Sequence, residues 1–222
     1  MRYFLIGDSH SQVIFPALKT LLSALGHQVQ TVSKPGWSES KFLSDASTMQ
    51  AISDAQPDAV VFALGGNNFD FSSKYVAYIN QLLNRARIAG AQHIAWIGPF
   101  PSSKSDVALR HDKTRNMLST ALQSFPDVDF IDGYSLADVR SSQDGVHFDR
   151  STYQRVAQAV FDILKKRVFA EDRPEQQPQQ PPVRIENQGQ EANYRTVMIA
   201  GVAAIWFLGF SFMVRKLKQK LS

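Results

Sequence analysis

An uninterrupted apolar run, AVVFAL, occupies residues 59–64 of this 222-residue chain. A strand without polar alternation has no face for solvent, so it has to be covered on both sides, as the strands of parallel sheets are. Four further strand-like segments are predicted at residues 2–6, 28–32, 94–97 and 128–131. Stretches of helical periodicity separate them, and an alternation of strands and helices gives a parallel sheet with helices on both faces. The pattern therefore predicts an α/β fold.

The predicted helices span residues 11–25, 75–89, 114–124 and 151–168. In the first helix, apolar residues recur near the 3.6-residue helical period, and Gly26 follows as a stop signal. Ser151 is a good N-cap for the last helix. Residues 1–170 are therefore predicted to form one domain.

The composition narrows the classes of function. The chain contains no cysteine, which excludes disulfides, cysteine zinc sites and a thiol nucleophile. Its net charge is +4, and four cations within residues 215–222 account for that charge. Because the rest of the chain is neutral, we expect no nucleic-acid-binding face. His27, His93 and His111 lack metal-ligand spacing, and no P-loop or dinucleotide-binding glycine pattern occurs, so no metal and no cofactor are expected.

Three segments follow the predicted domain. Residues 171–195 are rich in Gln, Pro and Glu, a composition typical of a flexible, disordered linker. Residues 196–214 carry no charged side chain, and about 20 such residues span the hydrocarbon core of a bilayer. We therefore expect a C-terminal transmembrane helix at 196–214, with a lipid bilayer as its partner, and a basic tail at 215–222.

The position of this span predicts a single-pass membrane protein anchored by its C-terminus. Only four apolar residues precede Gly7, too few for the apolar region of a cleavable signal peptide. Without such a signal, the domain is expected to face the cytosol, whereas the Lys/Arg bias of the tail favours the opposite orientation. A viral membrane would also suit this layout.

Four short polar blocks lie at or near the predicted carboxyl ends of strands, where α/β sheets bind ligands. GDSH at residues 7–10 follows the first strand, and KPGWS at 34–38 follows the second. GGNN at residues 65–68 follows the third strand, and DGVH at 144–147 precedes the last helix. Each block alone has a structural explanation, because serine caps helices and glycine forms turns. Their joint occurrence in this order indicates one site.

Together the four blocks resemble those of the SGNH, or GDSL-like, hydrolases, over about residues 1–168. The resemblance implies a three-layer α/β/α sandwich with a flavodoxin-like, five-stranded parallel sheet. It also implies a serine esterase in which Ser9 is the nucleophile, His147 the base and Asp144 the residue that orients the base. The oxyanion hole would be formed by the amides of Ser9 and Gly36 and the side chain of Asn67.

The chemistry of these residue types agrees with those roles. A serine hydroxyl is a weak nucleophile at neutral pH and needs an adjacent base, for which histidine is the usual choice. A carboxylate on the other ring nitrogen fixes the tautomer and stabilises the imidazolium. Glycine lets a backbone N–H approach the developing oxyanion closely, and an asparagine side chain can donate a further hydrogen bond.

Two positions depart from the family pattern. Asn68 stands where the family often has Asp, which leaves Asn68 as an alternative oxyanion donor. His10 replaces the Leu of the GDSL name, and the GDSH block also resembles SGNH domains attached to membrane O-acyltransferases. We expect His10 to begin the helix and to face solvent or substrate, without a catalytic role. The candidates for lining the substrate pocket are His10, Trp37, Asn68 and Phe148, although aromatic residues in such places are as often part of the core.

The leading hypothesis is a membrane-anchored serine hydrolase that cleaves carboxylic esters, of lipid or acetylated-glycan type, through an acyl-enzyme on Ser9. An O-acetyltransferase would use the same triad with a sugar hydroxyl in place of water, although its relatives also use a many-helix partner domain. A third hypothesis is a non-catalytic membrane protein with a structural or interaction role, built on an SGNH scaffold. The sequence does not determine the oligomeric state.

Overall fold

The structure, a computed structural model, describes residues 1–141 and 144–171, which belong to one compact unit, Met1–Pro174. Along the chain the elements are β1 Arg2–Gly7, α1 Ser11–Ala24, β2 Gln28–Ser33, α2 Glu39–Ser44, α3 Ala46–Ala55, β3 Ala59–Ala63, α4 Ser73–Ile88, β4 His93–Ile97, α5 Ser105–Leu122, β5 Val128–Ile131, α6 Gly133–Leu136, the 3-10 turn η1 Val139–Ser141 and α7 Arg150–Glu171.

The predicted C-terminal segments are not part of this description. The predicted span at 196–214, the tail at 215–222 and all but the first residue of the linker at 171–195 lie outside the described residues. Among the residues that are described, no helix is long and apolar enough to cross a membrane.

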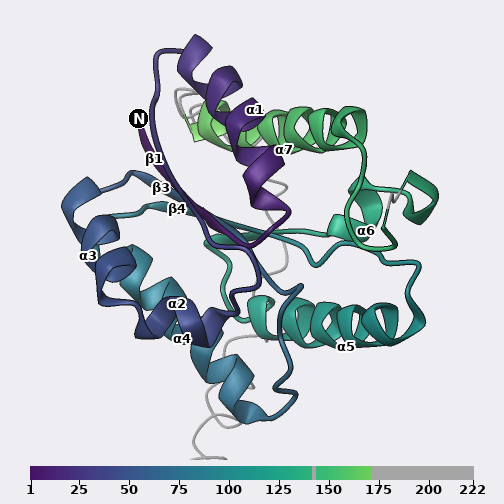
Figure 1. The fold of residues 1–222 in the computed structure, drawn as a ribbon. Coiled ribbons are helices and arrows are strands. Elements are labelled where there is room, and N and C mark those ends of the chain that lie inside the picture. The colour runs from purple at the N-terminus through teal and green to yellow at the C-terminus, as the bar shows by residue number, and fades with distance from the viewer. Residues whose placement is uncertain (142–143, 172–222) are drawn as a thin grey trace, which may run out of the picture. The chain divides into compact units, whose positions relative to one another are not determined.

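The five strands of the described domain form one parallel sheet in the order β2-β1-β3-β4-β5 (Figure 1). This is the flavodoxin-like strand order, so the predicted sheet is confirmed. In the register, Gly7 at the end of β1 lies opposite Ser33 of β2 and Ala63 of β3. The loops after these three strands therefore leave the sheet next to one another, at its carboxyl edge.

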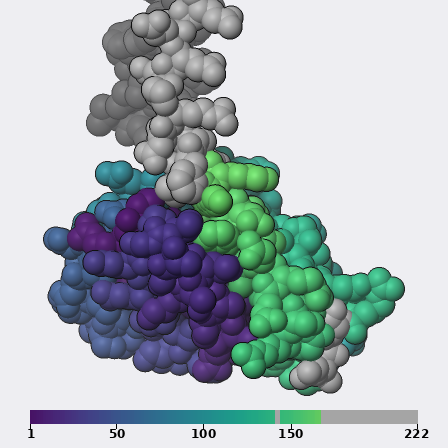
Figure 2. All heavy atoms as spheres, turned by 90° about the horizontal axis from the view of Figure 1, so that it is seen from above, coloured from purple at the N-terminus to yellow at the C-terminus, as the bar shows by residue number. Residues whose placement is uncertain are grey.

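Helices cover both faces of the sheet (Figure 1). On β1, Tyr3 and Leu5 pack in one core with α1 and α7, whereas Phe4 and Ile6 pack on the opposite face with helices α2 to α5. Seen from above, α1 in purple and α7 in green lie side by side (Figure 2). Every residue of β3 is buried, as its lack of polar residues requires.

Most predicted elements are present, with shifts at their ends. β5 has the predicted bounds, whereas α5 begins at Ser105, well before the predicted start at residue 114. The helices α2 and α3 occupy a stretch in which the sequence patterns predict no element.

The predicted N-cap of the last helix is wrong by two residues. α7 begins at Arg150, and the carboxylate of Asp149 accepts a hydrogen bond from the Thr152 amide at 2.7 Å. Ser151 lies inside the first turn, and its hydroxyl donates to the same carboxylate. Aspartate is as favourable an N-cap as serine, and Asp149 rather than Ser151 is the N-cap of α7.

Candidate active site

Ser9 lies in the tight turn that joins β1 to α1. Glycine is required at position 7, because a Cβ atom there would lie 2.4 Å from the Cβ of Ser11. The Ser11 hydroxyl donates to the Asp8 carbonyl oxygen at 2.6 Å, and the His10 amide donates to the Asp8 carboxylate at 3.1 Å. These bonds fix the turn, and the residue before α1 is His10, so the hydroxyl of Ser9 is not used as a helix cap.

In the predicted triad, His147 lies within hydrogen-bond distance of both Ser9 and Asp144. Ser9 Oγ is 2.9 Å from Nε2 of His147, and Nδ1 of His147 is 2.8 Å from Oδ2 of Asp144. With a proton on Nδ1, the ring donates to the carboxylate and presents Nε2 as an acceptor for the serine hydroxyl. This is the geometry that a serine nucleophile and its base require.

A short turn before α7 delivers both Asp144 and His147. Oδ1 of Asp144 accepts hydrogen bonds from the amides of Val146 at 2.8 Å and His147 at 2.6 Å. The His147 side chain, followed by these amides, holds the pKa of Asp144 well below its usual range. Asp144 is therefore ionised beside the imidazole, in agreement with the exposure of about half of its side chain (53%).

The loop after β4 is hydrogen-bonded to this turn. The carbonyl oxygen of Gly145 accepts hydrogen bonds from Ser102 Oγ at 2.5 Å and from the Ser103 amide at 2.9 Å. Gly145 has a φ of +86°, in the left-handed region that favours glycine. A Cβ atom there would also lie 2.8 Å from Cγ of Lys104. The position of the base thus depends on a loop that is distant in sequence.

Two amides of the predicted oxyanion hole, those of Ser9 and Gly36, make no hydrogen bond within the described part of the chain. Gly36 has a φ of +72°, again a conformation suited to glycine. Its loop is anchored beside the Ser9 turn, because the Lys34 amide donates to the Gly7 carbonyl oxygen at 2.9 Å. Both amides are available to donate to an oxyanion.

Asn67, the predicted third donor, is held by a buried carboxylate. Its Nδ2 donates to Oδ2 of Asp8 at 3.3 Å. A carboxamide nitrogen carries two N–H groups, so the second remains available for an oxyanion. Burial raises the pKa of Asp8 to about 7, against the hydrogen bonds from the His10 amide, the Gly66 amide and Asn67.

Asn68 has a different environment from Asn67. It is buried, with Nδ2 3.4 Å from Thr114 Oγ1, and its Oδ1 accepts a hydrogen bond from the Asp70 amide at 2.9 Å. Because only 3% of Asn68 is exposed and its side chain is bonded inside the protein, the structure supports Asn68 neither as the oxyanion donor nor as a residue that lines the pocket.

The expectation that His10 faces solvent or substrate is wrong. Only 3% of His10 and 4% of Phe148 is exposed, and their rings pack against each other and against Phe100. Both residues therefore belong to the core rather than to a pocket wall. Trp37 is half-buried, with its ring against Phe42, and its proposed role in lining the pocket stays a prediction.

The sequence patterns did not identify His111 or Tyr153, which also contact the site. The ring nitrogens of His111 lie 2.7 Å from the Phe100 carbonyl oxygen and 3.0 Å from that of Gly66. His111 thus joins α5 to the loops that follow β3 and β4. Burial lowers its pKa, although both carbonyl oxygens favour the protonated ring. Neither residue belongs to a local motif, so only the fold brings them to the site.

No group of three or more His, Asp or Glu residues in the described ranges could hold a metal ion. The buried histidines are committed to protein atoms: His10 to Tyr153, and His111 to two carbonyl oxygens. The third histidine of the site, His147, contacts Ser9 and Asp144.

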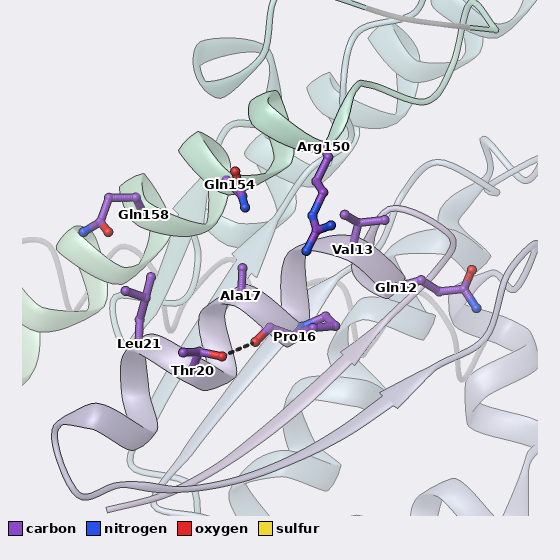
Figure 3. Close-up of a pocket in the computed structure, with 9 residues that line it drawn as sticks. All are labelled: Gln12, Val13, Pro16, Ala17, Thr20, Leu21, Arg150, Gln154 and Gln158. Carbon is purple, nitrogen blue, oxygen red and sulfur yellow. Dashed lines mark hydrogen bonds between the residues drawn. The ribbon is translucent and has the colours of Figure 1, made fainter.

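An open groove of about 580 Å³ lies between α1 and α7 (Figure 3). Its lining combines apolar and polar side chains of the two helices: Gln12, Val13, Pro16, Ala17, Thr20, Leu21, Arg150, Gln154 and Gln158. None of the three triad residues lines it. The groove is thus separate from the triad, although both helices begin directly after the turns that carry Ser9 and His147.

Comparison with known proteins supports the architecture. No protein-family model matches the sequence, and no curated protein matches it. A carbohydrate esterase family 3 protein from Talaromyces cellulolyticus is 16% identical with a TM-score of 0.61, over 77% of this chain and 99% of that chain. A lipase/acylhydrolase from Enterococcus faecalis is 17% identical with a TM-score of 0.59, over 75% of this chain and 97% of that chain.

A peptidoglycan O-acetylesterase is also similar, at 18% identity and a TM-score of 0.56, over 65% of this chain. The match covers 47% of that protein, so this chain spans about half of its length. At these identities the likeness shows the fold. The described domain therefore shares its α/β fold with these esterases and this acylhydrolase.

Proposed function

We propose that this protein is a serine hydrolase of carboxylic esters. The observation that carries the proposal is the continuous chain of contacts from Ser9 Oγ to His147 at 2.9 Å and from His147 to Asp144 at 2.8 Å. Two far-separated sequence blocks meet there, at the edge of the sheet where α/β proteins bind ligands. The similar structures named above, all described as esterases or acylhydrolases, support the same class of reaction.

In the first step, Ser9 Oγ attacks the ester carbonyl carbon while Nε2 of His147 takes the hydroxyl proton. The carbonyl oxygen becomes an oxyanion, which accepts hydrogen bonds from the amides of Ser9 and Gly36 and from Asn67. His147 then protonates the departing alcohol oxygen as the carbon–oxygen bond breaks. The products are a free alcohol and an acyl group esterified to Ser9.

In the second step, water attacks the acyl carbon of the ester on Ser9. Nε2 of His147 removes one proton from this water, the tetrahedral oxyanion occupies the same donors, and the serine oxygen leaves as it regains a proton. The carboxylic acid is released. Throughout both steps, Asp144 holds the proton on Nδ1 and balances the charge of the imidazolium.

The substrates that we propose are lipid esters or acetylated glycans. Among the similar structures, a peptidoglycan O-acetylesterase and an acetyl-xylooligosaccharide esterase act on esters of sugars. The transmembrane helix predicted at residues 196–214 would tether the domain to a bilayer, with the domain facing the cytosol. Such a tether would favour esters at or near a membrane surface.

Substrate hydrolysis by the full chain in detergent tests this proposal. We expect turnover of aryl acetate and of at least one acetylated oligosaccharide or lipid ester, and loss of about 10⁴-fold or more in rate for Ser9→Ala. Ser23→Ala, an exposed serine on α1, is the matched control and should retain full activity. Product analysis with an added sugar acceptor separates release of free acid from acyl transfer. A folded protein that turns over none of these esters would overturn the proposal.

A further inference from the structure

Next to the triad lies a buried pair of polar side chains that the mechanism above does not use. Nδ1 of His10 is 2.8 Å from the hydroxyl oxygen of Tyr153, and only 3% of each residue is exposed. The His10 ring also packs against the ring of His147, with centroids 5.2 Å apart. A buried polar pair beside the triad needs an explanation, because burying either side chain without a hydrogen-bond partner would cost free energy of folding.

The Tyr153 hydroxyl has a second contact. It accepts a hydrogen bond from the amide of Phe148 at 3.3 Å. Phe148 follows His147 directly in the chain, and His10 follows Ser9. One hydroxyl on α7 therefore touches the neighbour of the nucleophile and the neighbour of the base, which come from two separate turns.

The donors and acceptors of Phe148, Tyr153 and His10 determine the direction of the two hydrogen bonds of the Tyr153 hydroxyl. The Phe148 amide can only donate, so the hydroxyl oxygen accepts there, which leaves its own proton free to donate to Nδ1 of His10. Burial raises the pKa of Tyr153 to about 12, so the hydroxyl keeps that proton. Burial, followed by the neighbouring His147, lowers the pKa of His10 to about 3, so His10 stays neutral. In the tautomer with its proton on Nε2, the lone pair of Nδ1 accepts the hydroxyl proton of Tyr153.

We propose that Tyr153 is a positioning residue which, through His10 and the Phe148 amide, sets the distance between Ser9 and His147. The inference rests on the proposed function, because it assigns a role in the reaction of that triad. Tyr153 itself does not touch the reacting atoms. Its hydroxyl acts as a clamp between the β1–α1 turn and the turn before α7, and a displacement of about 1 Å between reacting groups can cost about 100-fold in rate.

Tyr153→Phe tests the clamp, because it removes only the hydroxyl and keeps the ring in the core. We expect kcat for a short-chain aryl ester to fall about 10- to 100-fold with little change in KM. The second-order rate of Ser9 labelling by a fluorophosphonate should fall in parallel. Val160→Ala is the matched control: it destabilises the same helix from a fully buried position two turns further on, and should lower Tm without lowering kcat.

A double-mutant cycle with His10→Leu examines the coupling. Leucine keeps an apolar side chain in the core but cannot accept the hydroxyl proton. If the clamp acts through His10, Tyr153→Phe should cost much less in kcat in the His10→Leu background than in the wild-type protein. Full additivity of the two losses would overturn the link between these residues.

A readout that needs no turnover separates this inference from the proposed function. In ¹⁵N-histidine NMR spectra of the full chain in detergent, Tyr153→Phe should move the ring resonances of both His10 and His147, whereas Val160→Ala should leave those of His147 in place. Unmoved His147 resonances would overturn the clamp even if the wild-type protein is active. Moved resonances in a protein that neither turns over esters nor reacts at Ser9 would support the link between the turns and contradict the proposed hydrolase.

Discussion

At the scale of single residues, two buried carboxyl groups distinguish the site from an ordinary sheet edge. Asp8 is 2% exposed and holds Asn67, while Glu39 is 1% exposed and accepts a hydrogen bond from the Tyr75 hydroxyl at 2.9 Å. The second carboxylate oxygen of Glu39 has no hydrogen-bond partner in the described part of the protein. Burial raises the pKa of both groups to about 7, and Glu39 also raises that of Asp8.

These raised pKa values predict that the free energy of unfolding falls as pH rises. When folding raises the pKa of a carboxyl group, the protonated form of that group is favoured in the folded state. The folded state is therefore most stable at a pH at which the group is protonated both before and after unfolding. This stability is lost as pH rises from the pKa of the group in the unfolded chain toward its pKa in the folded protein. For Glu39 this window runs from 4.5 to about 7. We expect Glu39→Gln to reduce the loss of unfolding free energy across this window, as measured by urea denaturation at its two ends. An equal loss in the variant and the wild type would contradict this assignment.

Asn67 offers a direct test of the oxyanion hole. Asn67→Ala removes the side-chain donor, and kcat should fall about 10²- to 10³-fold with little change in KM, because the bond forms only in the transition state. Steady-state kinetics on an aryl acetate measures this change. Asn84→Ala, on the exposed part of α4, is the matched control. A loss below about threefold, set against the expected range, would remove Asn67 from the mechanism.

The residues of the predicted triad could be named from local sequence motifs, whereas the residues that surround them could not. Asp144 and His147 are three positions apart in one turn, and Ser9 directly follows a strand, so motif and position were sufficient to name them. Tyr153 and His111 could not be found in this way, because their partners lie in other loops of the chain. The burial of His10 also depends on α7, which begins far along the chain at Arg150.

At the scale of elements, sequence periodicity predicted the long elements, whereas the short helices form without a clear periodic pattern. The fully buried strand β3 and the amphipathic α1 were predicted because their patterns are strong. In contrast, α2 and α3 are only 6 and 10 residues long, too short for a clear period. Asp45 is a local signal for α3, since its carboxylate caps this helix through the Thr48 amide at 3.2 Å. The start of α5 has no side-chain cap, which explains why its first residues were missed.

The contact between α1 and α7 is expected to carry much of the stability of the site. Leu18 of α1 is fully buried in the core that includes α7. Leu18→Ala should lower the free energy of unfolding by about 2–5 kcal/mol through lost burial and the cavity left behind. Urea denaturation followed by circular dichroism measures this, with the exposed neighbour Lys19→Ala as control. A change within about 0.5 kcal/mol, the range typical of surface substitutions, would contradict this account of the core.

At the scale of the whole molecule, the parallel topology gathers residues that are far apart in sequence. The strand order β2-β1-β3-β4-β5 places the loops after β2, β1 and β3 at one edge, and the turn before α7 returns to the same edge. The alternation of strands and helices was sufficient to predict this sheet. The membrane span predicted at residues 196–214 also concerns the whole molecule, and it lies outside the described residues.

The predicted membrane anchor can be tested by fractionation. We expect the full chain to remain with membranes after alkaline carbonate extraction and to be released by detergent, because an apolar span of about 20 residues inserts stably. A chain that ends at residue 195 lacks the span and should be found in the supernatant. Extraction of the full chain by carbonate alone would contradict the anchor without affecting the triad.

In the reaction proposed above, Ser9 acts as an activated nucleophile. The most direct test of this role is fluorophosphonate labelling of the full chain in detergent, followed by peptide mass spectrometry. The structure predicts one phosphonyl adduct, on Ser9, that forms much more slowly in His147→Ala and is absent in Ser9→Ala. A folded protein that acquires no adduct, or acquires it on a different serine, would contradict the claim.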